Sequence, residues 1–162
     1  MVFVLILGLA GCGNRGPAVQ FVEGTVSVDG TPLENTLVVF CPKDILGDPN
    51  NVKRPLMAGG TTDKKGYYRL SSLQGGAIGG GTTIGEYDVT IVKKTNTRPA
   101  WVPSGPGDRP PSAEAVRPIF QYDTPEIFER QETTPITVKV ERGKNRFDFD
   151  LKSDDSFTVN GQ

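Results

Sequence analysis

The stretch 136-ITVKVERGKNRFDFDL-151 decides the fold class, because apolar and polar residues alternate towards both of its ends. A period of two places successive side chains on opposite faces of a β-strand, whereas an amphipathic helix needs a period of about 3.6. We therefore predict two strands, at 136–140 and 146–151, and we expect the Gly-containing segment between them to close a hairpin.

The same alternation assigns side chains to the two faces of each strand. On the outer face, Lys139 would lie across from Asp148 and Asp150, with an attraction of about 0.2–1 kcal/mol per pair. The inward positions, together with one residue of an earlier strand, predict the core between two sheets. These predicted core residues are Val89, Val138, Phe147 and Phe149.

Similar short runs recur along the chain between turn signals, and none keeps the apolar period of a helix over three turns. Asp29-Gly30 is a dipeptide that two-residue hairpins favour, and the turn 63–66 combines an aspartate with a glycine. The run 36–41 is apolar on both faces, which predicts a central strand. The further predicted strands lie at 23–28, 36–41, 56–61, 67–71 and 87–93.

These runs predict an all-β domain, a seven-stranded Greek-key sandwich of the immunoglobulin-like kind. Two long loop insertions interrupt it, a glycine-rich one at 71–85 and a proline-rich one at 94–118. We expect the polar C-terminal tail to be flexible. The predicted division is a signal peptide at 1–11, a tether at 12–18, the sandwich at 19–152 and the tail at 153–162.

Four blocks carry a resemblance to a known family. They are GTVSVDGTPLENTLVVF at 24–40, TDKKGYY at 62–68, GEYDVTI at 85–91 and GKNRFDFDL at 143–151. In this order they resemble the carboxypeptidase regulatory-like, transthyretin-like β-sandwich of small bacterial lipoproteins. The resemblance implies a non-catalytic adhesion, scaffold or accessory module and names no ligand. It also implies that Phe120 and Tyr122 pack on the core just before the last strands.

The N-terminus contains an apolar run, residues 2–10, that is too short to span a membrane but suits a secretory signal. Its end, Leu9-Ala10-Gly11-Cys12, resembles the lipobox of bacterial lipoproteins, which implies cleavage before Cys12 and lipidation of its thiol. Gly13 in place of aspartate then indicates the outer membrane. Because no Lys or Arg precedes the run, we expect either a start codon upstream of Met1 or a sequence that has been trimmed at its N-terminus. The alternative is an N-terminal strand that ends in a buried cysteine.

Composition excludes several classes of function. The net charge of −1, with no Lys/Arg cluster, argues against nucleic acid as a partner. The chain has no histidine, which excludes Ser-His-Asp and Cys-His triads and histidine-bound zinc, so we expect no enzyme activity and no cofactor. Cys41 lies in an apolar run and is predicted to be buried. No metal site is expected at Asp123, Glu126, Glu129 and Glu132, because their spacing is not that of a calcium loop.

The proline-rich insertion surrounds Trp101, the only tryptophan of the chain. Such a long connection between strands is usually functional or disordered, and its prolines favour extended backbone. In one interpretation Trp101 folds back as a lid over the edge of the sandwich. In the other, Trp101 forms a contact surface for a protein or glycan together with Arg98 and Arg109, since Trp and Arg are enriched at binding hot spots.

Two functions from different classes follow. The favoured hypothesis is a membrane-anchored, non-enzymatic lipoprotein of the bacterial cell envelope that binds or supports protein or glycan partners. The alternative is a carboxylate-based hydrolase on a transthyretin-like scaffold, which needs two acids about 5–9.5 Å apart in a cleft.

Overall fold

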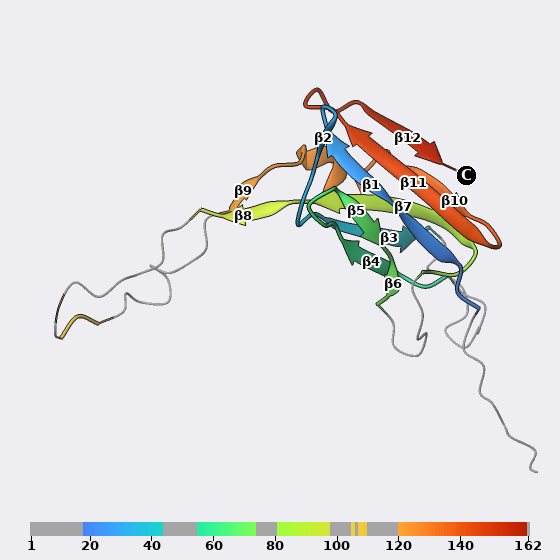
Figure 1. Ribbon diagram of the computed structural model, residues 1–162, viewed down its shortest axis with the longest axis horizontal. Helices are drawn as coiled ribbons and strands as arrows, with labels where there is room; N and C mark the ends of the chain where they lie inside the picture. Colours follow the sequence, from blue (N-terminus) through green and yellow to red (C-terminus); the bar gives the residue numbers. More distant parts are fainter. Residues whose placement is uncertain are drawn as a thin grey trace, which may run out of the picture.

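The computed structural model describes residues 18–43, 55–73, 81–97, 105, 107–109 and 120–161. Within these ranges the protein consists of β-strands and one short 3₁₀ helix (Figure 1). The predicted signal peptide, Cys12, Arg98 and Trp101 lie outside the described residues. Among the described residues, no helix is long and apolar enough to cross a membrane.

The first sheet has five strands in the order β12-β11-β1-β2, and β5 also pairs with β1. β1 and β11 run parallel, whereas the other pairs are antiparallel. The two-residue hairpin predicted at Asp29-Gly30 is confirmed, because both residues have the positive φ, 49° and 77°, that its turn requires. The strands are β1 (Phe21–Val28), β2 (Thr31–Pro32), β5 (Tyr67–Arg69), β11 (Lys144–Leu151) and β12 (Phe157–Gly161).

The second sheet has five antiparallel strands in the order β10-β7-β3-β4-β6. β3 lies between β7 and β4, which confirms the prediction of a central strand. Its side chains Val38 and Phe40 are fully buried, and Cys41 on its other face is also buried. The strands are β3 (Leu37–Pro42), β4 (Ala58–Thr61), β6 (Ser71–Ser72), β7 (Gly85–Val92) and β10 (Thr137–Val140).

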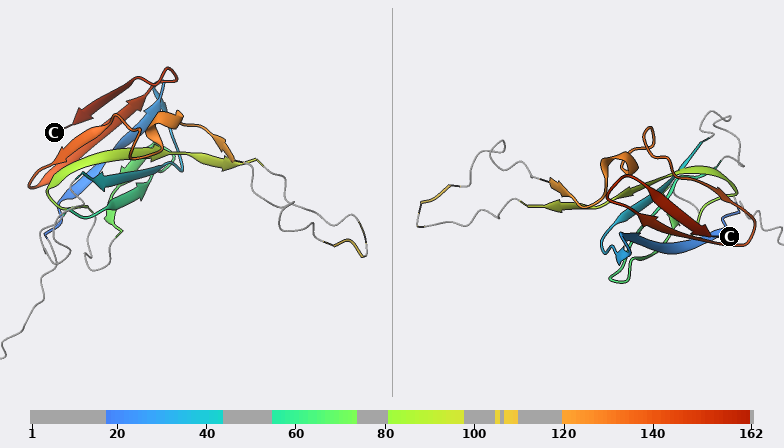
Figure 2. Two further views of the ribbon diagram at one scale, coloured as in Figure 1. Left: turned by 180° about the vertical axis from the view of Figure 1, so that it is seen from behind. Right: turned by 90° about the horizontal axis from the view of Figure 1, so that it is seen from above.

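The two sheets pack face to face in a β-sandwich-like arrangement, and the core lies between them (Figure 2). Phe40 of the second sheet contacts Phe147 and Phe149 of the first, with ring centroids 5.9 Å and 6.4 Å apart. Phe147, Phe149, Val138 and Val89 are all buried, as predicted. Burying one such side chain contributes about 1.5–3 kcal/mol, so these inward faces hold the sheets together.

The predicted hairpin between β10 and β11 is wrong. β10 pairs with β7 in the second sheet, whereas β11 pairs with β1 in the first, so the chain crosses between the sheets at 141–143. Buried Asn145 holds this crossing, since its side chain accepts from Glu141 N at 2.8 Å and donates to Glu141 O at 3.0 Å. Lys139 therefore pairs with Glu141 and not with Asp148 or Asp150. Alternation reports which face a residue occupies, but not which strand lies beside it.

The C-terminal tail differs from the flexible segment that the sequence predicts. Phe157–Gly161 forms β12, which pairs antiparallel with β11. Phe157 and Val159 pack partly against the core, and the Phe157 ring meets buried Phe128 edge to face. Burial of these two apolar side chains, together with the backbone ladder, orders a segment that is polar by composition. The described residues thus contain twelve strands, several of them only two or three residues long.

A two-stranded ribbon, here called the arm, projects from the sandwich in every view (Figures 1 and 2). It consists of β8 (Lys94–Asn96), which follows β7, and β9 (Phe120–Tyr122). Tyr122 is 48% exposed, so its predicted packing on the core is wrong. β9 pairs only with β8, and the predicted packing of the Phe120 side chain lies outside what the structure describes. The 3₁₀ helix Glu126–Phe128, which follows β9, contributes a fully buried aromatic side chain to the core, that of Phe128.

Candidate functional site

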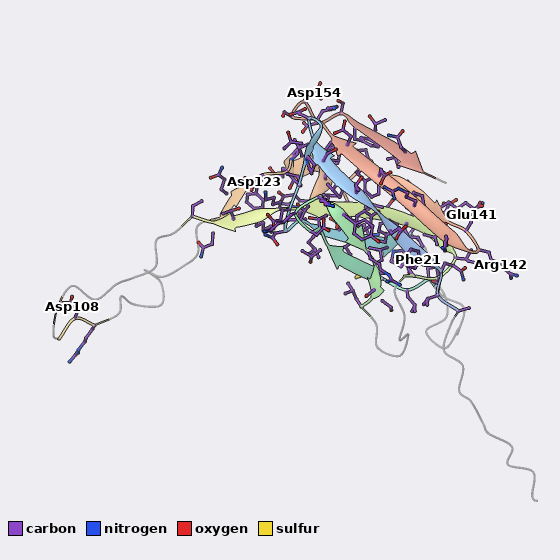
Figure 3. The ribbon with its side chains drawn as sticks, in the orientation of Figure 1. Phe21, Asp108, Asp123, Glu141, Arg142 and Asp154 are labelled. Carbon is purple, nitrogen blue, oxygen red and sulfur yellow. The ribbon has the colours of Figure 1, made fainter. Side chains whose placement is uncertain are left out.

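The segment predicted to contact a partner, 94–118, begins with β8 of the arm, and most of it lies outside the described residues. Of its three singled-out residues only Arg109 is described, and it is exposed. Next to it is a small turn in which Gly105 N donates to Asp108 Oδ2 at 3.0 Å. Asp108 lies far from both sheets, whereas Asp123 lies at the root of the arm (Figure 3). The structure does not bring Arg109 onto the sandwich, and Arg98 and Trp101 fall outside the described residues.

Polar contacts join the two strands of the arm at its root. The Nζ of Lys93 lies 3.5 Å from Asp123 Oδ2, and Thr95 donates to the same oxygen at 3.2 Å. The Nζ of Lys94 lies 5.0 Å from the centre of the Tyr122 ring, a cation–π contact worth about 0.5–1 kcal/mol at an exposed site. These contacts link β8 to β9 at the base of the arm.

The outer face of the first sheet is a second candidate surface. It is defined here by the outward side chains Phe21, Glu23, Tyr67, Arg69, Arg146 and Asp148, which come from β1, β5 and β11. Tyr67 donates to Glu23 Oε2 at 2.6 Å, and this hydrogen bond raises the pKa of the Tyr67 phenol. The guanidinium of Arg69 lies 4.4 Å above the Phe21 ring. Aromatic and charged groups are thus interleaved on one sheet face.

Asp148 is the most fully bonded carboxylate of this outer face. Its Oδ1 accepts from the backbone and the hydroxyl of Thr25, both at 2.9 Å, and its Oδ2 accepts from Arg146 Nε at 2.9 Å. Desolvation raises the pKa of Asp148, but the hydrogen bonds from Arg146 and Thr25 outweigh it, so the pKa lies below its usual value. Asp148 is therefore an ionised, positioned acceptor and is poorly suited to act as a general acid.

Asp150 is held in a similar way at the other end of β11. It accepts from Lys152, Ser27 and the backbone of Gly30, and these bonds lower its pKa to about 2. Both aspartates were expected on the outer side of their strand, and they lie there. Each aspartate, however, binds a basic residue two positions away in the sequence and a hydroxyl of β1.

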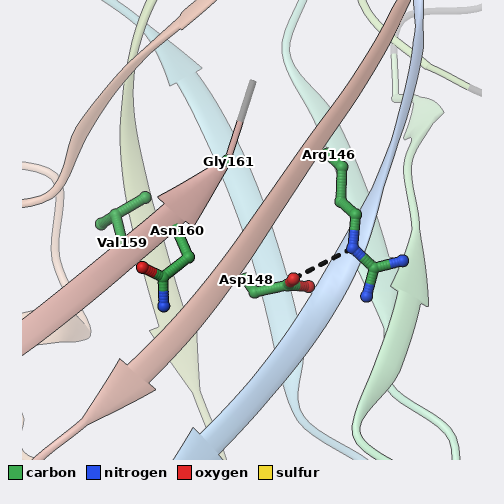
Figure 4. Close-up of a pocket in the computed structure, with 5 residues that line it drawn as sticks. All are labelled: Arg146, Asp148, Val159, Asn160 and Gly161. Atoms are coloured by element: carbon green, nitrogen blue, oxygen red, sulfur yellow. Dashed lines mark hydrogen bonds and ion pairs between the residues drawn. The ribbon is translucent and has the colours of Figure 1, made fainter.

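An open hollow lies beside the outer face, with a volume of about 690 Å³. Figure 4 shows that Arg146 and Asp148 come from one strand and Asn160 from its neighbour. A second hollow, of about 260 Å³, is lined by Glu126 and Arg130, whose Oε1 and NH2 atoms lie 3.3 Å apart. Each hollow contains a single carboxylate paired with an arginine. Neither provides the two acids that a glycoside hydrolase needs.

The acids considered for metal binding do not converge. Among the described residues, no three Cys, Asp or Glu side chains are placed to hold a metal ion. Asp123 faces Lys93, and one carboxylate oxygen of Glu129 is buried without a hydrogen-bond partner, so that desolvation raises the pKa of Glu129. Cys41 is buried and free, as predicted, and burial raises the pKa of its thiol. Cys41 is therefore a packing residue and a poor nucleophile.

The sequence did not single out the outer face of the first sheet as a site. Its residues Glu23, Tyr67 and Arg146 are far apart in the chain and meet only through the pairing of β5 with β1 and of β1 with β11. The sequence signal that could have indicated this surface is that the outward-facing positions of each alternating run contain charged and aromatic residues. The chain has no match among protein-family models, curated proteins or solved structures.

Proposed function

We propose that this protein is a lipid-anchored, non-enzymatic module of the bacterial cell envelope that binds a protein or glycan partner. Its domain would be a transthyretin-like, carboxypeptidase regulatory-like Greek-key sandwich, for which the two packed sheets and the crossing connection at 141–143 are supporting observations. The observation that carries the proposal is the arm, because a ribbon that leaves the core presents the segment between its strands to a partner.

The arm suits binding for an energetic reason. Lys93 and Thr95 bind Asp123 and so join the two strands of the arm near the root, which leaves contacts made beyond the tip remote from the core. The segment 98–119 is rich in proline, which reduces the conformational entropy lost on binding. Trp101 adds a large amphipathic side chain with few rotatable bonds.

The anchor is proposed at Cys12, with the outer membrane as the location. Residues 12–18 would then form a tether of at most roughly 25 Å, at about 3.3–3.6 Å per residue. The arm would act from a domain held close to the membrane surface. Two acyl chains anchor a protein stably, whereas one chain binds only weakly and reversibly.

The anchor predicts that Cys12→Ser releases the protein from membranes. Wild-type protein expressed in a bacterial host is expected to pellet with membranes and to incorporate labelled palmitate, because lipidation needs the thiol. The variant is expected to do neither. Cys41→Ser serves as the matched control and should still be labelled. A wild-type protein that takes up no palmitate, or a Cys12→Ser variant that stays in the membrane pellet, would show the proposal to be wrong.

The binding role predicts that replacing residues 98–119 by a short Gly-Ser linker removes the partner but keeps the fold. β8 and β9 remain in this variant, so its melting temperature should match that of the wild type. Partners cross-linked in envelope preparations would be identified by mass spectrometry and then tested pairwise. Trp101→Ala is expected to weaken binding by about 2 kcal/mol or more, the size of a hot-spot residue.

Arg142→Ala is the matched control, because Arg142 lies on the opposite side of the sandwich from Asp108 (Figure 3). It is expected to leave binding unchanged. The lid interpretation makes the opposite forecast, namely that the linker variant unfolds and that Trp101 fluoresces as a buried indole in the isolated protein. Either result, or a partner retained at full affinity by the linker variant, would overturn the arm as the binding surface.

A further inference from the structure

Strand β12 forms one edge of the first sheet, and its free side has a defined hydrogen-bonding pattern. Lys152 N donates to Ser156 O at 2.8 Å, so these two residues form a hydrogen-bonded pair between β11 and the segment leading into β12. Such pairs alternate along antiparallel strands. Thr158, opposite Asp150, and Asn160, opposite Asp148, therefore bond to β11. The N–H and C=O groups of Phe157, Val159 and Gly161 consequently face away from the sheet.

The other edges of the two five-stranded sheets are protected, and β12 is not. β10 carries the exposed Lys139, β5 carries Arg69, and β2 contains Pro32. β6 has only two residues. Charges, prolines and short length are the usual devices that prevent a strand edge from pairing with another chain. β12 has five residues and contains neither a charge nor a proline, so its edge is open to pairing.

We propose that two copies of this chain associate through β12, antiparallel about a twofold axis at Val159. In this register Val159 pairs with Val159 of the second copy, and Phe157 pairs with Gly161. These are the residues with outward backbone groups, so every outward N–H meets a C=O. An interface of this kind is self-complementary, as twofold symmetry requires. The pairing joins the two first sheets into one continuous sheet.

The side chains of β12 also fit this register. Thr158 lies opposite Asn160, a pair of uncharged groups that can hydrogen-bond. Phe157 lies opposite Gly161, where an aromatic ring can cover a residue that has no side chain of its own. No two like charges are opposed. Because Asn160 and Gly161 line the open hollow beside Arg146, the dimer places the two hollows on either side of the axis.

Sedimentation of the full chain tests this dimer independently of the proposed function. Cys12→Ser would be included in every variant, so that an acyl chain cannot drive association. The parent is expected to dimerise as concentration rises. The double variant Thr158→Lys/Asn160→Lys opposes lysines across the axis at two symmetry-related positions and should raise the dimer dissociation constant by about tenfold.

The lysines are not expected to harm the monomer, because the cross-strand neighbours of these positions on β11 are Asp150 and Asp148. Thr158→Lys and Asn160→Lys alone are the matched controls, since each places a lysine opposite a neutral residue and should leave the dissociation constant near that of the parent. A second variant, Val159→Pro, removes the central outward N–H, spares the bonds to β11, and should also weaken the dimer.

Amide hydrogen exchange reads out the register directly. In the dimer the amides of Phe157, Val159 and Gly161 should become protected as concentration rises, whereas those of Thr158 and Asn160 are protected at every concentration. A chain that sediments as a monomer throughout overturns the proposal, as does protection at the outward amides that does not depend on concentration. A monomer whose outward amides become protected only when an extended peptide is added would assign the edge to another protein and also contradict the dimer.

Discussion

Replacing Phe149 by alanine is expected to lower the free energy of unfolding by about 3–5 kcal/mol, the usual loss for a buried phenylalanine. Phe149 is 1% exposed, stacks on Tyr68 with ring centroids 6.1 Å apart, and meets the edge of Phe40. Its removal leaves a cavity at the contact between the two sheets. Thermal unfolding followed by circular dichroism should show a midpoint lower by roughly 10 °C or more.

Tyr122→Ala is the matched control for this change, because it also removes an aromatic ring but from the exposed arm. It is expected to shift stability by less than about 1 kcal/mol, the size of its one cation–π contact. If the two variants had the same melting temperature, Phe149 would not be the inter-sheet contact that the structure shows.

Gly24→Ala is expected to destabilise the protein by about 3 kcal/mol, the upper end of the usual cost of overpacking. A Cβ built on Gly24 would lie 1.8 Å from the backbone oxygen of Phe147, a distance at which the backbone must move. The same oxygen accepts the Tyr68 hydroxyl at 2.9 Å, so the displacement would also disturb a buried hydrogen bond. The expected result is a lower urea midpoint and weaker pairing of β1 with β11.

Gly105→Ala is the control, since nothing lies within 4 Å of its added Cβ. This variant should differ from the wild type by no more than about 0.5 kcal/mol. Equal urea midpoints for the two alanine variants would mean that β1 and β11 are not in close contact at Gly24.

The inward faces of the strands could be predicted because they are a local property. Phe147 and Phe149 alternate with polar residues, and a strand has only two faces, so the apolar set must face the core. The turns are local for the same reason. Asp63 accepts from Lys65 N at 2.8 Å and Tyr67 N at 3.0 Å, while Gly66 takes a φ of 73°, as the sequence of that turn predicts.

The candidate surfaces were less predictable, because they depend on contacts between distant residues. The proline-rich composition indicated an unusual segment near the arm. It did not indicate that β8 and β9 project from the body and leave Tyr122 exposed. The outer face of the first sheet needs Tyr67 beside Glu23. Nothing in the sequence near either residue specifies that neighbour.

The sequence by itself determined that the described part of the chain is all-β, which side of its main strands is buried and where the tight turns lie. Only the tertiary structure decided which strands are neighbours. β10 and β11 are adjacent in sequence but belong to different sheets, and β11 pairs instead with β1, at the other end of the described chain. The physical reason is that alternation only requires Val138 and Phe149 to face the core. Both side chains do so whether β10 and β11 pair in a hairpin or lie in opposite sheets. The free energy that separates these arrangements comes from burying both sheets against each other.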